Sequence, residues 1–204
     1  MKTVTIEISG TTPLLVHRFG EDPEQAGGTR RVEVSKRDPR TEAEKVVYKD
    51  KDGHFYFSGF SITGCMRNAG AGHKMRGSRK TLRFVVPSAV RILNETITIL
   101  NGNGKPAENF EVDSRPVTIP ATKGRVMRHR PRFDNWSAKF SLLVDDKNLA
   151  LDDAHMLLNE GGQFFGVGDF RPEKGGPFGC FQVTKWSVLK DEKVEEAEEE
   201  LVEA

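Results

Sequence analysis

Short runs in which every second residue is apolar recur along this chain, and such runs predict half-buried β-strands. Residues 2–9 alternate around Val4, Ile6 and Ile8, and residues 136–142 repeat the pattern with Trp136, Ala138, Phe140 and Leu142. A strand with one apolar face has to be covered by a second layer of the protein. The alternation therefore favours an antiparallel sheet with one side packed against helices.

Two segments show helical spacing instead, and their places between the strands predict the fold class. We expect one helix that is capped by Ser61 and runs to about Ala71, and a second helix from Asp152 to Phe165. The full order is strand, hairpin, helix, strands, hairpin excursion, strand, helix, glycine-rich loop and strand. Two helices on one face of an antiparallel sheet is the ferredoxin-like plan of α+β proteins, which RNA-recognition domains also use.

Turn residues divide the rest of the chain. Asp52-Gly53 predicts a tight hairpin turn, and residues 82–93 and 95–100 predict two further strands. Residues 107–134 predict a β-hairpin that protrudes from the sheet as a thumb. In the last strand, Phe181, Val183 and Lys185 are expected to share one face.

Domain organisation and charge are linked in this sequence. We expect residues 1–190 to form a single domain, with a flexible arm at 21–44, and residues 191–204 to form an acidic, disordered tail. The last fourteen residues hold eight acids and one lysine, so the formal net charge of +1 hides 30 basic and 22 acidic side chains in residues 1–190. The tail either solvates the chain end or competes with a ligand for a basic groove. Clustered positive charge is what phosphate binding requires.

The positive charge is concentrated in two segments that contain no acidic residue, Arg67 to Arg91 and Arg115 to Arg132, and both are candidates for binding nucleic acid. The alternative for the first segment is a solvated, salt-bridging surface. Arginine dominates the second, and guanidinium groups both fork onto phosphates and stack on bases. Val117, Ile119, Val126 and Met127 in the second segment either insert between bases or pack against protein. The candidate residues are Arg67, Lys74, Arg76, Arg79, Lys80 and Arg83 in the first segment, and Arg115, Lys123, Arg125, Arg128, Arg130 and Arg132 in the second.

A glycine-rich loop at residues 166–179 has neither the Lys-Ser/Thr of a P-loop nor the third glycine of a dinucleotide fingerprint. Its glycines allow close approach of nucleic acid to main-chain amides, with Arg171 and Lys174 supplying charge, or they form a packed turn between helix and strand. The glycines in question are Gly166, Gly168, Gly175, Gly176 and Gly179.

Signals for catalysis, metals and cofactors are weak. His17 or His129, with Asp113, is a candidate acid-base group for RNA cleavage, since imidazole titrates near neutral pH. The five histidines have no metal-ligand spacing, and the two cysteines have no nearby partner in sequence, so we expect neither metal nor cofactor. No apolar run reaches the length of a membrane span, and the start of the chain has no signal-peptide pattern, so we expect a cytoplasmic protein that contacts no membrane.

Two stretches resemble a known family. FSGFSITGCMRNAG is similar to the Gly-x-x-x-x-Gly-x-x-Arg helix entry of RAMP proteins, the repeat-associated superfamily of CRISPR systems, and FFGVGDFRPEKGGPFGCFQV is similar to their C-terminal glycine-rich loop. The whole chain also resembles small bacteriophage and prophage proteins. The RAMP resemblance implies a palm of the RNA-recognition type, a hairpin thumb and subunits that stack along a strand, as in CRISPR effector backbones. The chain is short for such a subunit, and its glycine loop is interrupted at Asp169-Phe170 and Pro172-Glu173.

Three functions are consistent with these patterns. The first is a non-catalytic protein that binds single-stranded RNA or DNA through its phosphates and assembles on it as a homo-oligomer or as part of a ribonucleoprotein. The second is a RAMP-type endoribonuclease, and the third is a phage assembly protein whose arginines contact an acidic partner. The sequence favours the first, because it offers many phosphate ligands and no convergent catalytic set.

Overall fold

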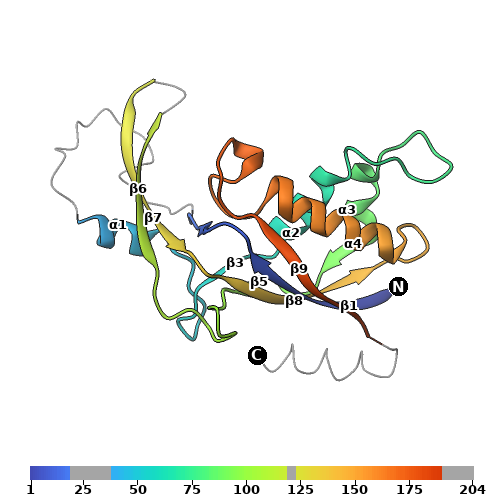
Figure 1. The fold of residues 1–204 in the computed structure, drawn as a ribbon, viewed down its shortest axis with the longest axis horizontal. Helices are drawn as coiled ribbons and strands as arrows, with labels where there is room; N and C mark the ends of the chain where they lie inside the picture. The colour runs from blue at the N-terminus through green and yellow to red at the C-terminus, as the bar shows by residue number, and fades with distance from the viewer. Residues whose placement is uncertain (19–37, 119–122, 190–204) are drawn as a thin grey trace.

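The computed structural model describes residues 1–18, 38–118 and 123–189, and a four-stranded antiparallel sheet lies at its centre (Figure 1). The sheet contains β1 (Lys2–Gly10), β4 (Val90–Ile92), β8 (Ser137–Val144) and β9 (Phe181–Val188), in the order β4-β8-β1-β9. Helix α2 (Phe60–Ala69) precedes β4 in the chain, and α4 (Leu151–Glu160) lies between β8 and β9. The succession β1-α2-β4-β8-α4-β9 with antiparallel pairing is the ferredoxin-like plan, so the predicted α+β class is confirmed.

The core lies between this sheet and its two helices, which cover the same face (Figure 1). Val4, Ile6 and Ile8 of β1 are at most 1% exposed, as their alternation predicted. In register with them, Phe140 and Leu142 of β8 point to the same side. The helices complete this core with Ile62, Met66, Ala154, Leu157 and Leu158.

The predicted hairpin excursion forms a long antiparallel ribbon that stands away from the sheet at one end of the molecule (Figure 1). Strand β6 (Glu111–Thr118) pairs with β7 (Arg125–Phe133), which also pairs with β2 (Leu14–Leu15). Helix α1 (Pro39–Lys45) packs against the base of the ribbon, with the Arg40 guanidinium 3.8 Å from the centre of the Phe110 ring. The expected arm at 21–44 therefore ends in a helix, which Asp38 caps by accepting from Thr41 N. Residues 21–37 and the expected tail at 191–204 lie outside the described residues.

Residues 82–89 differ from the predicted strand, because they form a 3₁₀ turn, η1 (Leu82–Phe84), and a short helix, α3 (Val86–Ala89). Their buried residues are Leu82, Val85, Val86 and Ala89, which is helical spacing. Pro87 has no N–H for a sheet ladder but fits the first turn of a helix. Of the strand predicted at residues 82–93, only the part that forms β4 is confirmed. The strand predicted at residues 95–100 is confirmed as β5 (Thr96–Thr98), which pairs with β3 (Tyr56–Ser58).

Both helices begin and end differently from the prediction. Helix α2 starts after Gly59, and the Ser61 hydroxyl donates to the carbonyl of Ser58 instead of capping the helix. After α4, residues Gly161–Phe165 form a π-helical turn, η2. A Cβ on Gly162 would lie 2.6 Å from the Phe181 ring, so glycine lets this wider turn approach the sheet.

A β-bulge explains a wrong prediction in β9. The pairing with β1 shifts between Glu7 and Ile8, so Val183 pairs with Ile8 while Lys185 pairs with Glu7. One extra residue reverses the alternation of side chains beyond it. Lys185 therefore lies on the open face of the sheet, and its Nζ is 3.1 Å from Glu7 Oε1.

No helix in the described ranges is both long and apolar enough to cross a membrane.

Candidate nucleic-acid interface

The first basic segment forms a loop and a short helical turn between α2 and β4. A β-bridge joins Lys74 to Thr81, and Met75 N donates to Lys80 O (2.9 Å), so residues 73–82 form a small closed loop. This loop and the β6–β7 ribbon lie toward opposite ends of the molecule (Figure 1). All six of the predicted phosphate ligands in this segment are exposed, namely Arg67, Lys74, Arg76, Arg79, Lys80 and Arg83.

The acidic neighbours of this loop come from α4, which is distant in sequence. Arg76 Nη2 lies 4.0 Å from Asp153 Oδ1, and His73 Nε2 lies 2.6 Å from Glu160 Oε2. The Arg76 side chain remains 85% exposed, and such surface pairs contribute little to stability. Within the described part of the chain, the other five predicted ligands of the segment make no ion pair, so they are available to an anionic ligand.

The second basic segment is free of acids in sequence but not in space. Arg115 Nε donates to both carboxylate oxygens of Asp113 (2.8 Å each), and Arg132 Nη2 lies 2.6 Å from Asp134. The Arg115 guanidinium also lies over the Phe178 ring, 4.6 Å from its centre. These contacts fix two of the predicted phosphate ligands to the protein itself.

Arg130 is the most enclosed of the predicted ligands, with 7% of the residue exposed. Its Nε lies 2.7 Å from Asp169 Oδ2, at an angle too bent for a hydrogen bond. Asp169 N donates to Leu15 O (2.8 Å), so the pair connects the ribbon, the N-terminal segment and the glycine loop. Asp169 was not among the sequence candidates, although it lies in the stretch GVGDFRP that carried the resemblance. A phosphate contact by Arg130 would require this ion pair to open.

The outer part of the ribbon is different. Lys123 and Arg125 are exposed, and no carboxylate among the described residues pairs with them. Met127 is 55% and Val126 is 37% exposed, whereas Val117 is half-buried. Ile119 lies outside the described residues. The end of the ribbon thus presents free positive charge beside apolar side chains.

The structure does not bring the three catalytic candidates together. His17 and Asp113 lie on one face of the ribbon, where Arg128 Nη1 donates to His17 Nε2 (3.3 Å) and Asp113 pairs with Arg130 in the ladder. His129 lies on the other face, with Nδ1 2.7 Å from Ser114 Oγ and Nε2 3.7 Å from a carboxylate oxygen of Glu42. Strand alternation therefore separates the two histidines.

Burial lowers the pKa of His17 below its ordinary value of 6.5. Asp169 opposes this shift, while the positive charges of Arg128 and Arg130 lower the pKa further. The neutral imidazole fits a site between two arginines, because a protonated one would add a third positive charge.

Packing accounts for most of the glycine loop. A Cβ on Gly179 would lie 1.8 Å from the carbonyl oxygen of Val167, and one on Gly176 would lie 1.8 Å from that of Phe170. Gly166 and Gly168 also approach backbone closely. Only Gly175 of the five has open space around its Cβ position, and its φ is +76°. The packed-turn interpretation therefore fits four of the glycines, and an approach of nucleic acid remains a prediction for the exposed Gly175.

The two charged residues predicted for this loop differ in availability. Arg171 Nη1 donates to Gly168 O (2.9 Å), and its Nη2 lies 2.6 Å from Glu173 Oε2. Lys174 is exposed. Arg171 thus stabilises the loop, while Lys174 is free to contact a ligand.

The open face of the four-stranded sheet has no aromatic side chain among its paired positions. Thr5 faces Ser141 and Ser187 there, and Glu7 lies between Lys139 and Lys185. RNA-recognition domains bind RNA by stacking bases on aromatic residues of this face. The same plan of strands therefore does not provide the same binding surface here.

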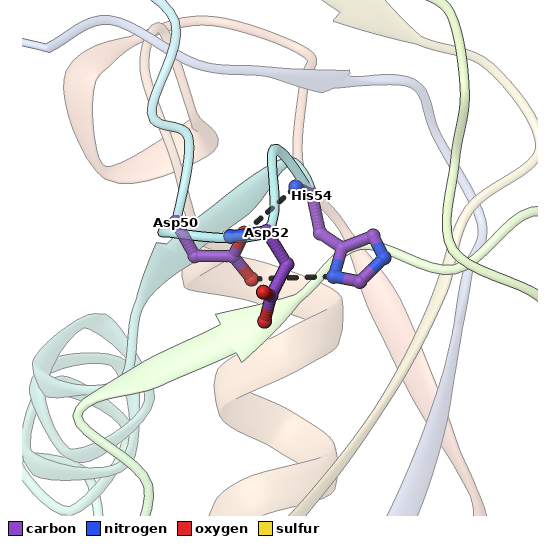
Figure 2. A group of neighbouring side chains, drawn as sticks. All are labelled: Asp50, Asp52 and His54. Atoms are coloured by element: carbon purple, nitrogen blue, oxygen red, sulfur yellow. Dashed lines mark hydrogen bonds and ion pairs between the residues drawn. The ribbon is translucent and has the colours of Figure 1, made fainter. Parts of the chain in front are cut away.

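One group of potential metal ligands occurs among the described residues, at the hairpin turn of Asp50, Asp52 and His54 (Figure 2). The Asp50 carboxylate accepts from the backbone amides of Asp52 (3.0 Å) and His54 (2.7 Å), and its other oxygen lies 3.4 Å from His54 Nδ1. These contacts are those of a side chain that closes a turn. The turn explains the cluster without a metal.

Comparisons with known proteins bear on the fold. No family model matches the chain, and a search of curated proteins gives no match. Among solved structures, a chain in the cryo-EM structure of Type III-B Cmr-beta bound to cognate target RNA is similar, with a TM-score of 0.53 and 11% sequence identity. The match covers 93% of this chain and 61% of that chain, so our protein spans about three fifths of its length. At this identity the similarity shows the fold, and it agrees with the α+β plan described above.

Proposed function

We propose that this protein binds single-stranded nucleic acid, with RNA as the first candidate, and that it does so through phosphate contacts as a subunit of a larger ribonucleoprotein. The observation that carries the proposal is that seven predicted phosphate ligands of the two basic segments are exposed and have no acidic partner in the described structure. They are Arg67 near the end of α2, Lys74, Arg79 and Lys80 on the loop, Arg83 on the turn that follows it, and Lys123 and Arg125 on the ribbon.

The chemistry of these groups supports phosphates as the ligand. Each phosphate that a surface lysine or arginine neutralises releases counterions, and this release favours binding. The fold supports RNA, because the similar chain belongs to Type III-B Cmr-beta bound to cognate target RNA. Membership of the RAMP superfamily, a role in a CRISPR effector and a location in the cytoplasm are parts of this proposal. A phage assembly protein whose arginines contact an acidic partner is the alternative function.

Assembly into an oligomer is the second part of the proposal. Met127 and Val126 are exposed on the ribbon, and a two-stranded ribbon is marginally stable alone in water. Burial against a neighbouring subunit, or between bases, would stabilise it. We do not extend the proposal to catalysis, because His17 and His129 lie on opposite faces of the ribbon.

The test is a titration of labelled single-stranded RNA and DNA at several salt concentrations. Each phosphate contact on a single strand contributes about 0.7 to the slope of log affinity against log salt. Replacing both Arg79 and Lys80 by alanine should therefore reduce the slope by about 1.4 for every oligonucleotide sequence. Lys185→Ala is the matched control, since this lysine pairs with Glu7 on the open sheet face.

Two results would contradict the proposal. A salt slope near zero would show that phosphates are not the ligand. The absence of binding to either nucleic acid at low salt would favour the acidic-partner function instead.

A further inference from the structure

Phe84 has an unusual position for a phenylalanine. Its side chain is 72% exposed, more than any other large apolar residue in the described structure. Phe60 and Phe164 are the other exposed phenylalanines, at 62% and 65%. Of the three, only Phe84 lies within a basic segment.

The backbone around Phe84 is firmly held. Phe84 N donates to Thr81 O (3.1 Å), and Val85 N donates to Leu82 O (2.9 Å). Leu82 is 4% and Val85 is 9% exposed, so the residues on either side of the turn anchor it in the core. The ring of Phe84 is therefore presented to solvent from a rigid turn.

Two arginines belong to the turn of Phe84 and to the helix end that this turn contacts. Arg83 precedes Phe84, and Arg83 N donates to Gly70 O (3.0 Å) at the end of α2. A Cβ on Gly70 would lie 2.7 Å from Arg83 N, so the turn and the helix end are in direct contact. Arg67 lies three residues before Gly70, on the same side of the helix end. The turn that carries the exposed Phe84 ring and the helix end that it contacts thus each carry one exposed arginine without an acidic partner in the described structure.

We infer that Phe84 is a base-stacking residue, on which one base of a single strand rests while Arg67 and Arg83 bind the flanking phosphates. This inference rests on the proposed function and adds to it where a base is held. Every base has a flat π-face, so stacking on an aromatic ring needs no particular sequence. The charges of Arg67 and Arg83 favour nucleic acid over an apolar protein surface as the partner of this region, because burying two arginines against apolar atoms would be unfavourable.

The location is consistent with the rest of the surface. The open sheet face lacks aromatic residues at its paired positions, so stacking there is not available. Phe84 lies instead in η1, shortly before α3 in the chain, and α3 lies toward the end of the molecule away from the ribbon (Figure 1).

The experiment compares binding of an oligouridylate with binding of an abasic strand of the same length, which keeps the sugar-phosphate backbone but has no bases. Phe84→Ala should weaken binding of the oligouridylate about 5- to 150-fold, the range for loss of one stacked base. It should leave binding of the abasic strand and the salt slope unchanged. Phe84→Trp should restore the affinity, and Phe164→Ala is the matched control for an exposed ring outside the basic segments.

The outcomes are distinct. Parent protein that binds neither strand contradicts the proposed function itself. If the parent binds both strands and Phe84→Ala binds the oligouridylate equally well, or loses affinity for both strands alike, the stacking role is wrong. An equal loss in Phe164→Ala would also overturn it, because any exposed ring would then suffice.

Discussion

The glycine loop allows a direct test of whether packing or ligand approach requires its glycines. Gly175 and Gly179 both have positive φ, +76° and +73°, so alanine is strained at each to a similar degree. They differ in space. A Cβ at Gly175 would meet nothing within 4 Å, while one at Gly179 would lie 1.8 Å from Val167 O.

The magnitudes follow from this difference. Forcing an alanine into the left-handed region costs about 1–2 kcal/mol, which is the whole expected effect of Gly175→Ala. At Gly179 the backbone must also move away from the new atom, and such overpacking typically adds about 1–3 kcal/mol. Movement would strain the hydrogen bonds from Val167 N to Gly179 O (2.9 Å) and from Gly179 N to Pro13 O (2.8 Å). Gly179→Ala should therefore be less stable than Gly175→Ala by about 1–3 kcal/mol.

The assay is thermal and urea unfolding of both variants, followed by binding to single-stranded RNA under conditions where each is folded. For a chain of this size, about 1 kcal/mol lowers the melting temperature by roughly 2–4 °C. Equal melting temperatures for the two variants would refute the packing argument. A selective loss of RNA binding in Gly175→Ala would show in addition that nucleic acid approaches the loop there.

Three further predictions follow from the ribbon and its base. Deleting residues 120–126 should leave the melting temperature nearly unchanged, because the core elements lie elsewhere, but should prevent long particles on a long oligonucleotide; unfolding of the deletion protein would place the segment in the core. Asp169→Asn should lower the free energy of unfolding by about 1–3 kcal/mol, less than for a fully buried pair, since Asp169 is 34% exposed; an unchanged urea midpoint would show that the pair with Arg130 is dispensable. Because the pKa of His17 is lower in the folded than in the unfolded chain, the unfolded chain takes up the proton at a higher pH as the pH falls. The stability that neutral His17 contributes is therefore complete above about pH 6.5 and is lost as the pH falls toward the folded pKa. His17→Gln should flatten the dependence of the free energy of unfolding on pH between about pH 7.5 and 5, and parallel pH curves for the variant and the parent would contradict the argument.

Periodicity predicted the parts of the fold that local sequence determines. The strands β1 and β8 follow directly from alternating apolar residues, and the buried faces of α2 and α4 follow from helical spacing. The errors lie where a single residue changes the pattern. A bulge in β9 moves Lys185 to the other face, and Pro87 converts an apolar run that looks like a strand into a helical turn.

The charged residues of the site were less predictable, for a physical reason. A residue's partner in an ion pair is set by the fold, and Asp169 reaches Arg130 only because the glycine loop returns to the base of the ribbon. Counting acids along the sequence therefore overestimated the free positive charge of the second segment. The predicted ligands of the first segment are all exposed, because they lie on a local loop and its flanking helical turns.

This division between paired and free cations limits how strongly binding can depend on salt. Breaking the enclosed ion pair of Arg130 would leave Asp169 without its partner. A phosphate contact with Arg130 therefore has to offset the free energy of that lost pair before it can contribute to affinity. The exposed cations carry no such cost. If only the seven exposed predicted ligands of the two segments and Lys174 contact phosphates, at about 0.7 per contact, the salt slope on single strands cannot exceed about 6. A steeper slope would mean that the paired arginines open on binding, and Asp169→Asn would then increase affinity by releasing Arg130.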